Sequence, residues 1–440
     1  MDSQMNDITV RRSESWSRTN SVNSSRRHSS RLSFSCIPQL DDAESDSVSE
    51  AGDIGDRVVH SNRYSDSGRN PLANVAEESG FILKEVTSPL PTDAILRDGE
   101  KREDEKKISL LLDYMLYLDF QAIGGILGVL TRYGLQKLFG PGIIGATSNQ
   151  SYMYLDLPCN MVGCFLMGWF GVVFKKDITD FSEHLAIGIT TGFLGSLTTF
   201  SGWNQKMLEL SVEGRWVFTI LGLLLGLFLV AYSIIFGVET ASYVKCLYMR
   251  SKVIPVSAES RRQGSFNGNI MKQHPIFLIV LLMMILGGLW CMSGVLENKE
   301  FKDGGSRAQL WLACIVGPFG VWIRWYLARL NGRGLGKSGS LKWLPFGTLI
   351  ANVSAACTMA ALASLKRTVK TTNCDTIVTA LQFGLLGCLS TVSTYMAEFN
   401  AMRESGCNWR AYAYAMSTHL PSFLLGTLIY SVPVWCNAFD

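Results

Sequence analysis

One apolar pattern occurs twice in this chain, and it restricts what the chain can fold into. Residues 192–203 read GFLGSLTTFSGW, and residues 384–395 read GLLGCLSTVSTY. Each segment places Gly-x-x-Gly and then a run of hydroxyl residues inside an apolar stretch. Because a bilayer offers no water to freed backbone groups, such a break is tolerated mainly where it is buried in protein or lines a wet cavity. Breaks at matching positions of two halves indicate a transport or ion site.

The composition is typical of a membrane protein. Of the 440 residues, 48% are hydrophobic and 18% are charged, whereas a soluble protein carries about 25% charged residues. The formal net charge of +3 gives no support for nucleic-acid binding. The chain has no C-x-x-C pair, no G-x-x-x-x-G-K-[ST] motif and no nucleophile–base arrangement, so we do not expect an enzyme.

Residues 1–107 differ from the rest of the chain, because they are polar, rich in Ser and Arg, and poor in aromatic residues. We predict that they form a disordered cytosolic tail. Arg26-Arg27-His28-Ser29-Ser30 and Arg11-Arg12-Ser13 would suit a basophilic kinase. Both a regulatory tail and a merely solvated tail are compatible with this composition.

The remainder contains nine apolar segments close to the length of about 20 residues that a spanning helix needs. They are residues 118–139, 152–174, 184–207, 215–241, 275–296, 308–330, 343–365, 375–401 and 411–435. We therefore predict an all-α polytopic membrane protein with nine spans.

The first four and last four spans match each other in order. The first of each set contains an arginine (Arg132 or Arg324), the second an asparagine (Asn160 or Asn352), and the third the helix break. The extra span at 275–296 inverts the second set, which predicts two inverted repeats related by a pseudo-two-fold axis in the membrane plane. The predicted parts are a first repeat at 108–243, a cytosolic loop with a linking helix at 244–300, and a second repeat at 301–440.

Basic residues in the short loops predict the orientation in the membrane. They are more numerous on the side of the N-terminus, which favours a cytosolic N-terminus and an exterior C-terminus. In this orientation Asn149-Gln150-Ser151, a glycosylation sequon, lies outside.

These motifs resemble those of the fluoride channel and exporter family, called CrcB or Fluc in bacteria and FEX in eukaryotes. The resemblance covers about residues 118–435 and rests on the motifs G-x-x-G-x-x-x-R-Y in the first span, G-T-L-x-x-N in the second and G-x-x-G-x-x-T-T-F-S in the third, together with their order and repetition. It implies a passive, fluoride-selective channel of the plasma membrane that exports fluoride and is complete in a single chain. The alternative is a secondary transporter of another small anion or metabolite. A membrane-embedded enzyme or scaffold would need clustered His, Asp or Glu within the spans.

The resemblance also indicates pore residues, whose amide and hydroxyl donors could replace the hydration shell of fluoride. The predicted pore residues are Asn160, Asn352, Phe200, Tyr395, Thr199, Ser201, Thr391, Ser393, Tyr414, Thr418 and Ser422. For the two asparagines, the alternative is that each amide only joins helices.

The family places two phenylalanines along each pore, taken from opposite repeats, with ring edges that can face an anion. Here Phe200 is kept, Tyr395 and Trp203 replace the second phenylalanine, and Val392 replaces the first. We therefore predict that the pore with Phe200 and Tyr395 conducts and that the pore with Val392 and Trp203 is degraded.

Three further interpretations concern charged and polar groups within the spans. Arg132 and Arg324 are expected to have a vestibule or structural role rather than to bind fluoride directly. The resemblance implies a structural sodium ion held by the backbone carbonyls of Gly195, Thr198, Gly387 and Ser390, the alternative being a kink without an ion. His419 and Pro421 are expected to form a local kink rather than a proton relay.

Overall fold

The computed structural model describes residues 92–252, 275–301, 305–331, 341 and 343–436. All of them belong to one compact unit, Asp42–Asp440. Most of the predicted tail lies outside the described residues, but its last part is helical from Thr92 onward. The predicted boundary at residue 107 is therefore inside a helix, in a segment that is rich in good helix formers.

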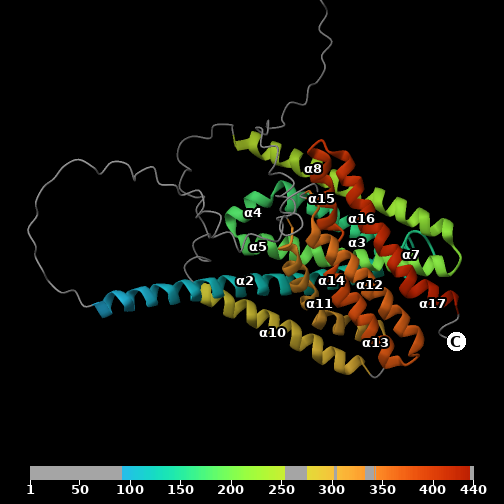
Figure 1. Ribbon diagram of the computed structural model, residues 1–440, viewed down its shortest axis with the longest axis horizontal. Helices are drawn as coiled ribbons and strands as arrows, with labels where there is room; N and C mark the ends of the chain where they lie inside the picture. Colours follow the sequence, from blue (N-terminus) through green and yellow to red (C-terminus); the bar gives the residue numbers. More distant parts are fainter. Residues whose placement is uncertain (1–91, 253–274, 302–304, 332–340, 342, 437–440) are drawn as a thin grey trace, which may run out of the picture. The chain divides into compact units, whose positions relative to one another are not determined.

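The described residues form helices and no strand (Figure 1). The first repeat contains α2 (Thr92–Phe139), α3 (Leu157–Leu166), η3 (Met167–Val173), α4 (Lys175–Phe181), α5 (Glu183–Ile187), η4 (Gly188–Leu194), α6 (Gly195–Leu197), α7 (Phe200–Val212) and α8 (Trp216–Lys252). The linking helix is α10 (Pro275–Glu300). The second repeat contains α11 (Ser306–Ala328), α12 (Phe346–Thr368), α13 (Thr372–Leu381), η6 (Gln382–Leu386), α14 (Gly387–Leu389), α15 (Ser393–Glu404), α16 (Asn408–Gly426), η7 (Thr427–Ser431) and α17 (Val432–Trp435).

Seven helices of the described chain are long and apolar enough to cross a membrane, and the bent pair Leu157–Val173 with Lys175–Phe181 makes an eighth. The ninth predicted span is helical from α16 to α17, but it is too polar to belong to this set. Its hydropathy is lowered by His419, Pro421 and several hydroxyl residues. By length and composition, the described residues therefore contain up to eight spans rather than the nine that were predicted.

The broken helices lie at the centre of the bundle and the linking helix lies at its edge. In the spanning part of Glu183–Val212 78% of the residues are buried, and in Thr372–Glu404 67% are buried, against 17% in Ile276–Glu300. In Figure 1, α10 runs along the outer side of α2 and α11. The linking helix thus connects the repeats without contributing much to the core.

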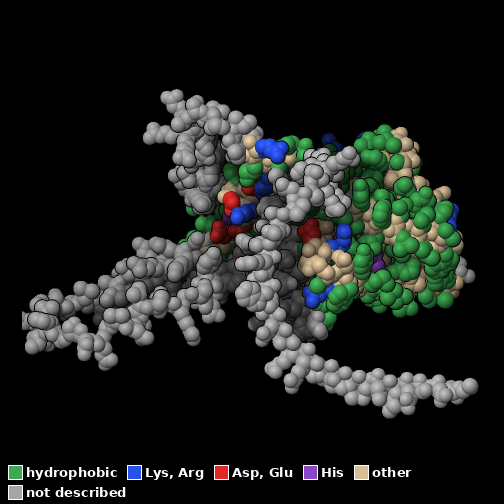
Figure 2. All heavy atoms as spheres, turned by 90° about the horizontal axis from the view of Figure 1, so that it is seen from above, with side chains coloured by type: hydrophobic (Ala, Val, Ile, Leu, Met, Phe, Trp, Pro, Cys, Tyr) green, Lys and Arg blue, Asp and Glu red, His purple; other side chains and the backbone are tan. Residues whose placement is uncertain are grey.

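The surface of the bundle is apolar, as a bilayer requires. In Figure 2 most described side chains in view are hydrophobic, while most of the charged ones gather at one end. Exposed leucine, isoleucine, valine and phenylalanine side chains are frequent on α8 and α10. A soluble monomer rarely exposes apolar patches of this extent, so this surface fits a position in lipid.

Candidate functional site

Each third span is interrupted at the repeated sequence. In the first repeat Thr198 (φ −98°, ψ 145°) and Thr199 (φ −140°, ψ 127°) are extended between α6 and α7. In the second repeat Ser390 is extended (φ −84°, ψ 155°) between α14 and α15. A π-helical turn, η4 or η6, precedes each break. The predicted breaks are confirmed, and they leave backbone N–H and C=O groups that need other partners.

Two buried asparagines satisfy part of this backbone. The Asn160 side chain accepts a hydrogen bond from the N–H of Thr199 (2.8 Å) and donates one to its carbonyl (3.1 Å). Asn352 does the same with Thr391, at 2.8 and 3.0 Å. Both asparagines are 0% exposed. This geometry supports the alternative that the amides join helices, while their role in the pore stays a prediction.

Two hydroxyl groups act across the repeats. Thr198 Oγ1 accepts hydrogen bonds from the N–H of Ser393 (3.1 Å) and of the residue before it (3.2 Å), at the start of α15. Ser390 Oγ accepts from the N–H of Ser201 (3.0 Å) and of the residue before it (3.2 Å), at the start of α7. Each broken helix is therefore capped at its restart by a hydroxyl from the other repeat.

The two buried arginines also connect the repeats. Arg132 donates from Nη2 to the carbonyl of Phe383 (2.6 Å), and its guanidinium lies 4.4 Å from the centre of that ring. Arg324 donates from Nη2 to the carbonyl of Thr191 (2.9 Å) and from Nε to the carbonyl of Cys388 (2.7 Å). Each arginine thus supplies a donor to backbone near the opposite break, and Arg324 also binds backbone of its own repeat, which supports a structural role.

Two glycines make room for these guanidinium groups. A Cβ atom at Gly195 would overlap Nη1 of Arg324, and a Cβ atom at Gly387 would overlap Nη1 of Arg132. The glycines of the repeated motif are therefore required by close approach. Their φ angles are not in the left-handed region, so conformational freedom is not the reason.

An aromatic cluster lies beside the breaks. The rings of Phe200 and Tyr395, which come from different repeats, are 6.3 Å apart at an interplanar angle of 78°. Tyr395 contacts Tyr414 edge to face at 5.1 Å. The His419 ring contacts Phe200 at 5.0 Å and Trp203 at 4.8 Å. The structure therefore brings together the two aromatic residues predicted for the conducting pore.

Tyr414, the first polar residue of the track on α16, lies next to this pair and binds a buried carboxyl group. Glu398, which is 2% exposed, accepts hydrogen bonds from Tyr414 Oη (2.6 Å) and Thr348 Oγ1 (2.7 Å). The hydroxyls of Thr418 and Ser422 donate to the carbonyls four residues earlier, at 2.9 and 2.7 Å. The sequence alone could not assign this polar track to a pore, whereas the structure places its first residue, Tyr414, in contact with Tyr395.

The corresponding region of the first repeat is filled by side chains. Trp203 donates from Nε1 to the carbonyl of Gly222 (3.3 Å) and stacks on Tyr154, with ring centres 5.7 Å apart. A Cβ atom at Gly226 would lie 2.5 Å from the indole, and one at Gly222 would lie 2.6 Å from the sulfur of Met207. The indole and the thioether thus occupy the space that the two glycines of α8 leave.

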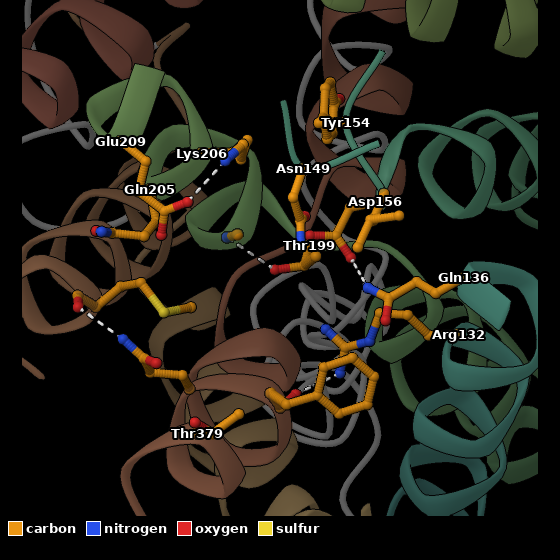
Figure 3. A pocket seen from close by; sticks show the side chains of 15 residues that line it. Arg132, Gln136, Asn149, Tyr154, Asp156, Thr199, Gln205, Lys206, Glu209 and Thr379 are labelled. Atoms are coloured by element: carbon orange, nitrogen blue, oxygen red, sulfur yellow. Dashed lines mark hydrogen bonds and ion pairs between the residues drawn. The ribbon is translucent and has the colours of Figure 1, made fainter. Parts of the chain in front are cut away.

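A cavity of about 190 Å³ lies between α2, α7 and η6 (Figure 3). Its lining includes Arg132, Asp156, Thr199, Gln205, Lys206 and Glu209. Two polar pairs lie in this wall, because Gln136 donates to Asp156 and Lys206 binds Glu209 at 2.9 Å. The cavity has the composition of a polar vestibule with charges of both signs.

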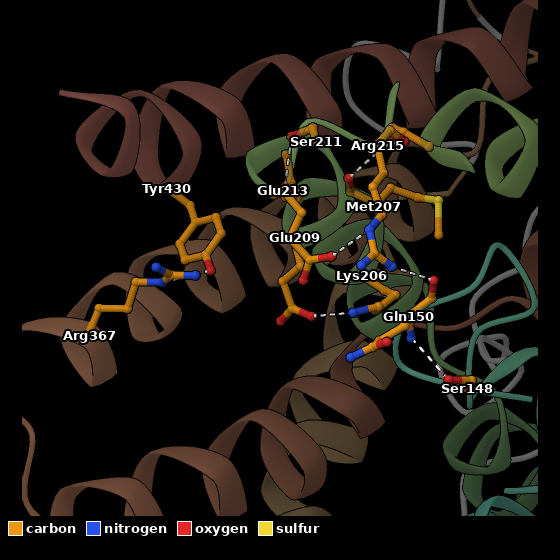
Figure 4. Close-up of polar contacts among 12 residues, drawn as sticks. Ser148, Gln150, Lys206, Met207, Glu209, Ser211, Glu213, Arg215, Arg367 and Tyr430 are labelled. Atoms are coloured by element: carbon orange, nitrogen blue, oxygen red, sulfur yellow. Dashed lines mark hydrogen bonds and ion pairs between the residues drawn. The ribbon is translucent and has the colours of Figure 1, made fainter. Parts of the chain in front are cut away.

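Further polar contacts join the loops and helix ends near this cavity (Figure 4). Arg215 donates to the carbonyl of Gln150 (2.8 Å), and Arg367 donates to the hydroxyl of Tyr430 (2.9 Å). Ser211 of the first repeat lies 3.4 Å from Ser431 of the second, oxygen to oxygen. Of these contacts, only the Ser211–Ser431 pair joins the two repeats, while the other two brace one repeat each.

The predicted site residues thus fall into two groups. The residues of both breaks, from Gly195 to Thr199 with Ser201 and from Gly387 to Ser393, lie together with the asparagines and arginines. The second group is the pair Phe200 and Tyr395 with the polar track. Sequence reasoning did not include Thr348 and Glu398 in the site, although the contrast between Glu398 and Lys206 in the other repeat was a usable signal.

Comparisons with known proteins agree with this organisation. The model of the CrcB-like protein family (Camphor Resistance, CrcB) matches residues 120–238 and again 311–430. The chain is 43% identical over 101 residues to the fluoride-specific ion channel FluC of Salinibacter ruber, which is 23% of this chain and 71% of that protein. It is 32% identical over 130 residues, 30% of this chain, to the whole length of the FluC of Geobacter metallireducens. No solved structure matches the chain.

Proposed function

This chain belongs to the CrcB-like family, and we propose that it is a fluoride channel, the activity in the printed names of its relatives. The two matched regions coincide with the two repeats, so the chain contains the fused pair. The observation that carries the proposal is the exchange of caps between the repeats, in which Thr198 and Ser390 each cap the other broken helix. Neither break is complete without the other repeat, as expected if one chain is the functional unit.

We propose one conducting path, through Phe200, Tyr395 and the polar track of α16. The rings of Phe200 and Tyr395 meet edge to face, and the hydrogen-bearing edge of an aromatic ring is electropositive. The other path would run past Trp203, whose indole packs tightly against Gly226 and donates a hydrogen bond to the carbonyl of Gly222. The side chains of the proposed path are themselves buried. The proposal therefore rests on the ring edges and hydroxyl groups that they offer to an anion, which Gly222 and Gly226 of α8 do not supply.

The transport is passive in this proposal. In an acidic exterior, hydrogen fluoride enters the cell and dissociates in the neutral cytosol. The negative-inside potential then drives the anion outward, at about 2.3 kcal/mol per charge for 100 mV. Multiple weak donors along a pore allow an ion to enter and to leave. The chain would thereby protect the cell from fluoride, and the plasma membrane is the location where this is useful.

A structural sodium ion is part of the proposal. The carbonyl groups of Gly195, Thr198, Gly387 and Ser390 would hold it, and carbonyl oxygens suit a hard cation. The extended conformation of Thr198 and Ser390 fits this, because it takes their carbonyls out of the helical ladder. The ion would hold the two breaks together. Replacing sodium with N-methyl-D-glucamine should then lower the unfolding temperature, whereas an unchanged temperature would contradict the site.

We further propose that the N-terminus is cytosolic and the C-terminus exterior, with the α16–α17 segment as a last crossing. A C-terminal tag should then react with antibody on intact cells. Detection only after permeabilisation would contradict this orientation. Kinase action on the tail is a separate proposal, which phosphate-specific staining of the full-length protein would test.

The proposed activity is tested with purified protein in liposomes loaded with potassium fluoride. Addition of a potassium ionophore should release fluoride rapidly, and the same vesicles loaded with chloride should release little. Release that depends steeply on a proton gradient would favour a secondary transporter instead. No fluoride release, from protein that is folded, would refute the channel.

A further inference from the structure

Two polar groups in the aromatic cluster have no hydrogen-bond partner among the described residues. They are the hydroxyl of Tyr395 and Nε2 of His419. Tyr395 is 0% exposed, and His419 is partly buried with Nε2 itself shielded from solvent. The two rings lie 6.0 Å apart, centre to centre, and both contact Phe200. Buried polar groups are normally hydrogen-bonded, so each such exception calls for an explanation.

The neighbouring hydroxyl groups do not hydrogen-bond Tyr395 or His419, because each already donates to another acceptor. Tyr414 donates to Glu398, and the hydroxyls of Thr418 and Ser422 donate to backbone carbonyls. An anion that reached this part of the path would therefore find Tyr395 and His419 as donors that need not break an existing hydrogen bond. A phenol has one O–H, and an imidazole has an N–H on one or both nitrogens.

The geometry points to an anion site in which the Tyr395 hydroxyl and the Nε2–H of His419 hydrogen-bond a fluoride ion beside the edge of Phe200. This site rests on the proposed function, since the ion is the one the pore conducts. It assigns to His419 a contact with the ion, in place of the local kink expected from the sequence. Aromatic edges alone offer weak electrostatic contact, whereas an O–H and an N–H offer hydrogen bonds to a charged partner, which are among the stronger ones.

Three substitutions test the site in the full-length protein. His419→Phe keeps an aromatic ring and removes the N–H, Tyr395→Phe removes only the hydroxyl, and His419→Gln keeps an N–H donor. The control is His184→Phe, at the only other histidine of the described residues. The His184 ring contacts the Tyr117 ring at 4.3 Å, and its Nε2 lies 3.5 Å from Asp113, so it is not part of the aromatic cluster.

The first measurement compares the unfolding temperature of the protein in detergent with sodium fluoride and with sodium chloride. The difference between the two temperatures reports fluoride binding without conduction. His419→Phe and Tyr395→Phe should each weaken the apparent fluoride affinity about tenfold or more. His419→Gln should lose less, and His184→Phe should bind as the unaltered protein does. If both substitutions leave the fluoride-dependent rise unchanged, the site is refuted.

The second measurement separates this inference from the proposed function. Fluoride release from liposomes containing the unaltered protein tests the function itself, and its absence would remove both. Normal release together with unchanged binding in both variants would remove only the Tyr395–His419 site. A double variant tests whether the two groups share one ion. Losses that depart from the product of the single losses support a shared ion, and losses that simply multiply contradict it.

Discussion

The hydroxyl of Thr198 lies 3.1 Å from the hydroxyl of Ser393, although the two residues belong to different repeats. The same Thr198 oxygen accepts the N–H of Ser393 at 3.1 Å. One side chain of the first break therefore caps the helix that restarts after the second. The symmetric contact is made by Ser390 and Ser201, whose oxygens are 2.9 Å apart.

This contact predicts the effect of removing one hydroxyl. Thr198→Val keeps the shape of the side chain but leaves two buried N–H groups of α15 without an acceptor. We expect the free energy of unfolding to fall by about 1–3 kcal/mol for such a loss. Thr198→Ser keeps the oxygen, as Ser390 does in the other repeat, and should be close to the unaltered protein. Equal thermal stability of the two variants in detergent would contradict the cap.

The close approach of arginine to glycine predicts a packing effect. Gly195→Ala would push a methyl group into the guanidinium of Arg324, and overpacking of this kind costs about 1–3 kcal/mol. Gly287→Ala in α10 is the control, because nothing lies within 4 Å of its Cβ position. Thermal unfolding should show a clear loss for the first variant only. A Gly195→Ala protein as stable as the control would mean that the guanidinium can move away freely.

The buried guanidinium of Arg324 should be needed for stability. Arg324→Met removes the donors to the carbonyls of Thr191 and Cys388, and the loss of a buried charged donor costs about 1.5–3 kcal/mol. Arg307→Met, on the same helix, removes a guanidinium that is 74% exposed and should cost at most about 1 kcal/mol. Comparable losses in chemical or thermal unfolding would argue against the structural role of Arg324.

The single-pore proposal predicts unequal effects of two matched substitutions. Phe200→Ile removes the ring that contacts Tyr395 and His419, so fluoride release from liposomes should fall about tenfold or more if an electrostatic contact of about 1.5 kcal/mol is lost. Val392→Ala, at the equivalent position, should change release little. Equal losses in proteins of equal thermal stability would reject a single pore and leave the fluoride assignment standing.

The exchange of caps predicts that half of the chain is inactive. A fragment of residues 1–270 contains Ser201 but not Ser390, so the N–H groups at the start of α7 lose their acceptor. We expect such a fragment to give no fluoride release when reconstituted alone. Co-expression with residues 271–440 should restore release if the halves assemble. Full activity of the first fragment alone would refute the fused architecture.

Much of the architecture could be predicted from residues that are close together in the chain. Apolar runs of about 20 residues reveal spanning helices, because hydropathy is a property of a local segment. The breaks after Gly195 and Gly387 were predictable for the same reason. The ninth predicted span is the exception. His419, Pro421 and the hydroxyl residues make it less apolar than the segments that are long and apolar enough to cross a membrane.

The partners of the polar side chains could not be predicted in this way. Sequence indicated that Arg132, Arg324, Thr198 and Ser390 matter, but not that each acts on the opposite repeat. Nor did it assign Tyr414 and its track to the side of Tyr395, or place His419 between Phe200 and Trp203. These facts depend on contacts between residues about 190 or more positions apart in most cases.

The sequence by itself therefore determined the membrane class, the repeat and the positions of the two breaks, all of which follow from local hydropathy and backbone chemistry. Only the tertiary structure decided which groups satisfy the broken backbone and which side chains pack beside it. The physical reason is that a buried hydrogen bond or a filled gap depends on how side chains from both repeats pack. Trp203 and Tyr395 occupy equivalent positions in the two repeats, yet Trp203 packs against a glycine of α8 and Tyr395 packs against Tyr414 of α16.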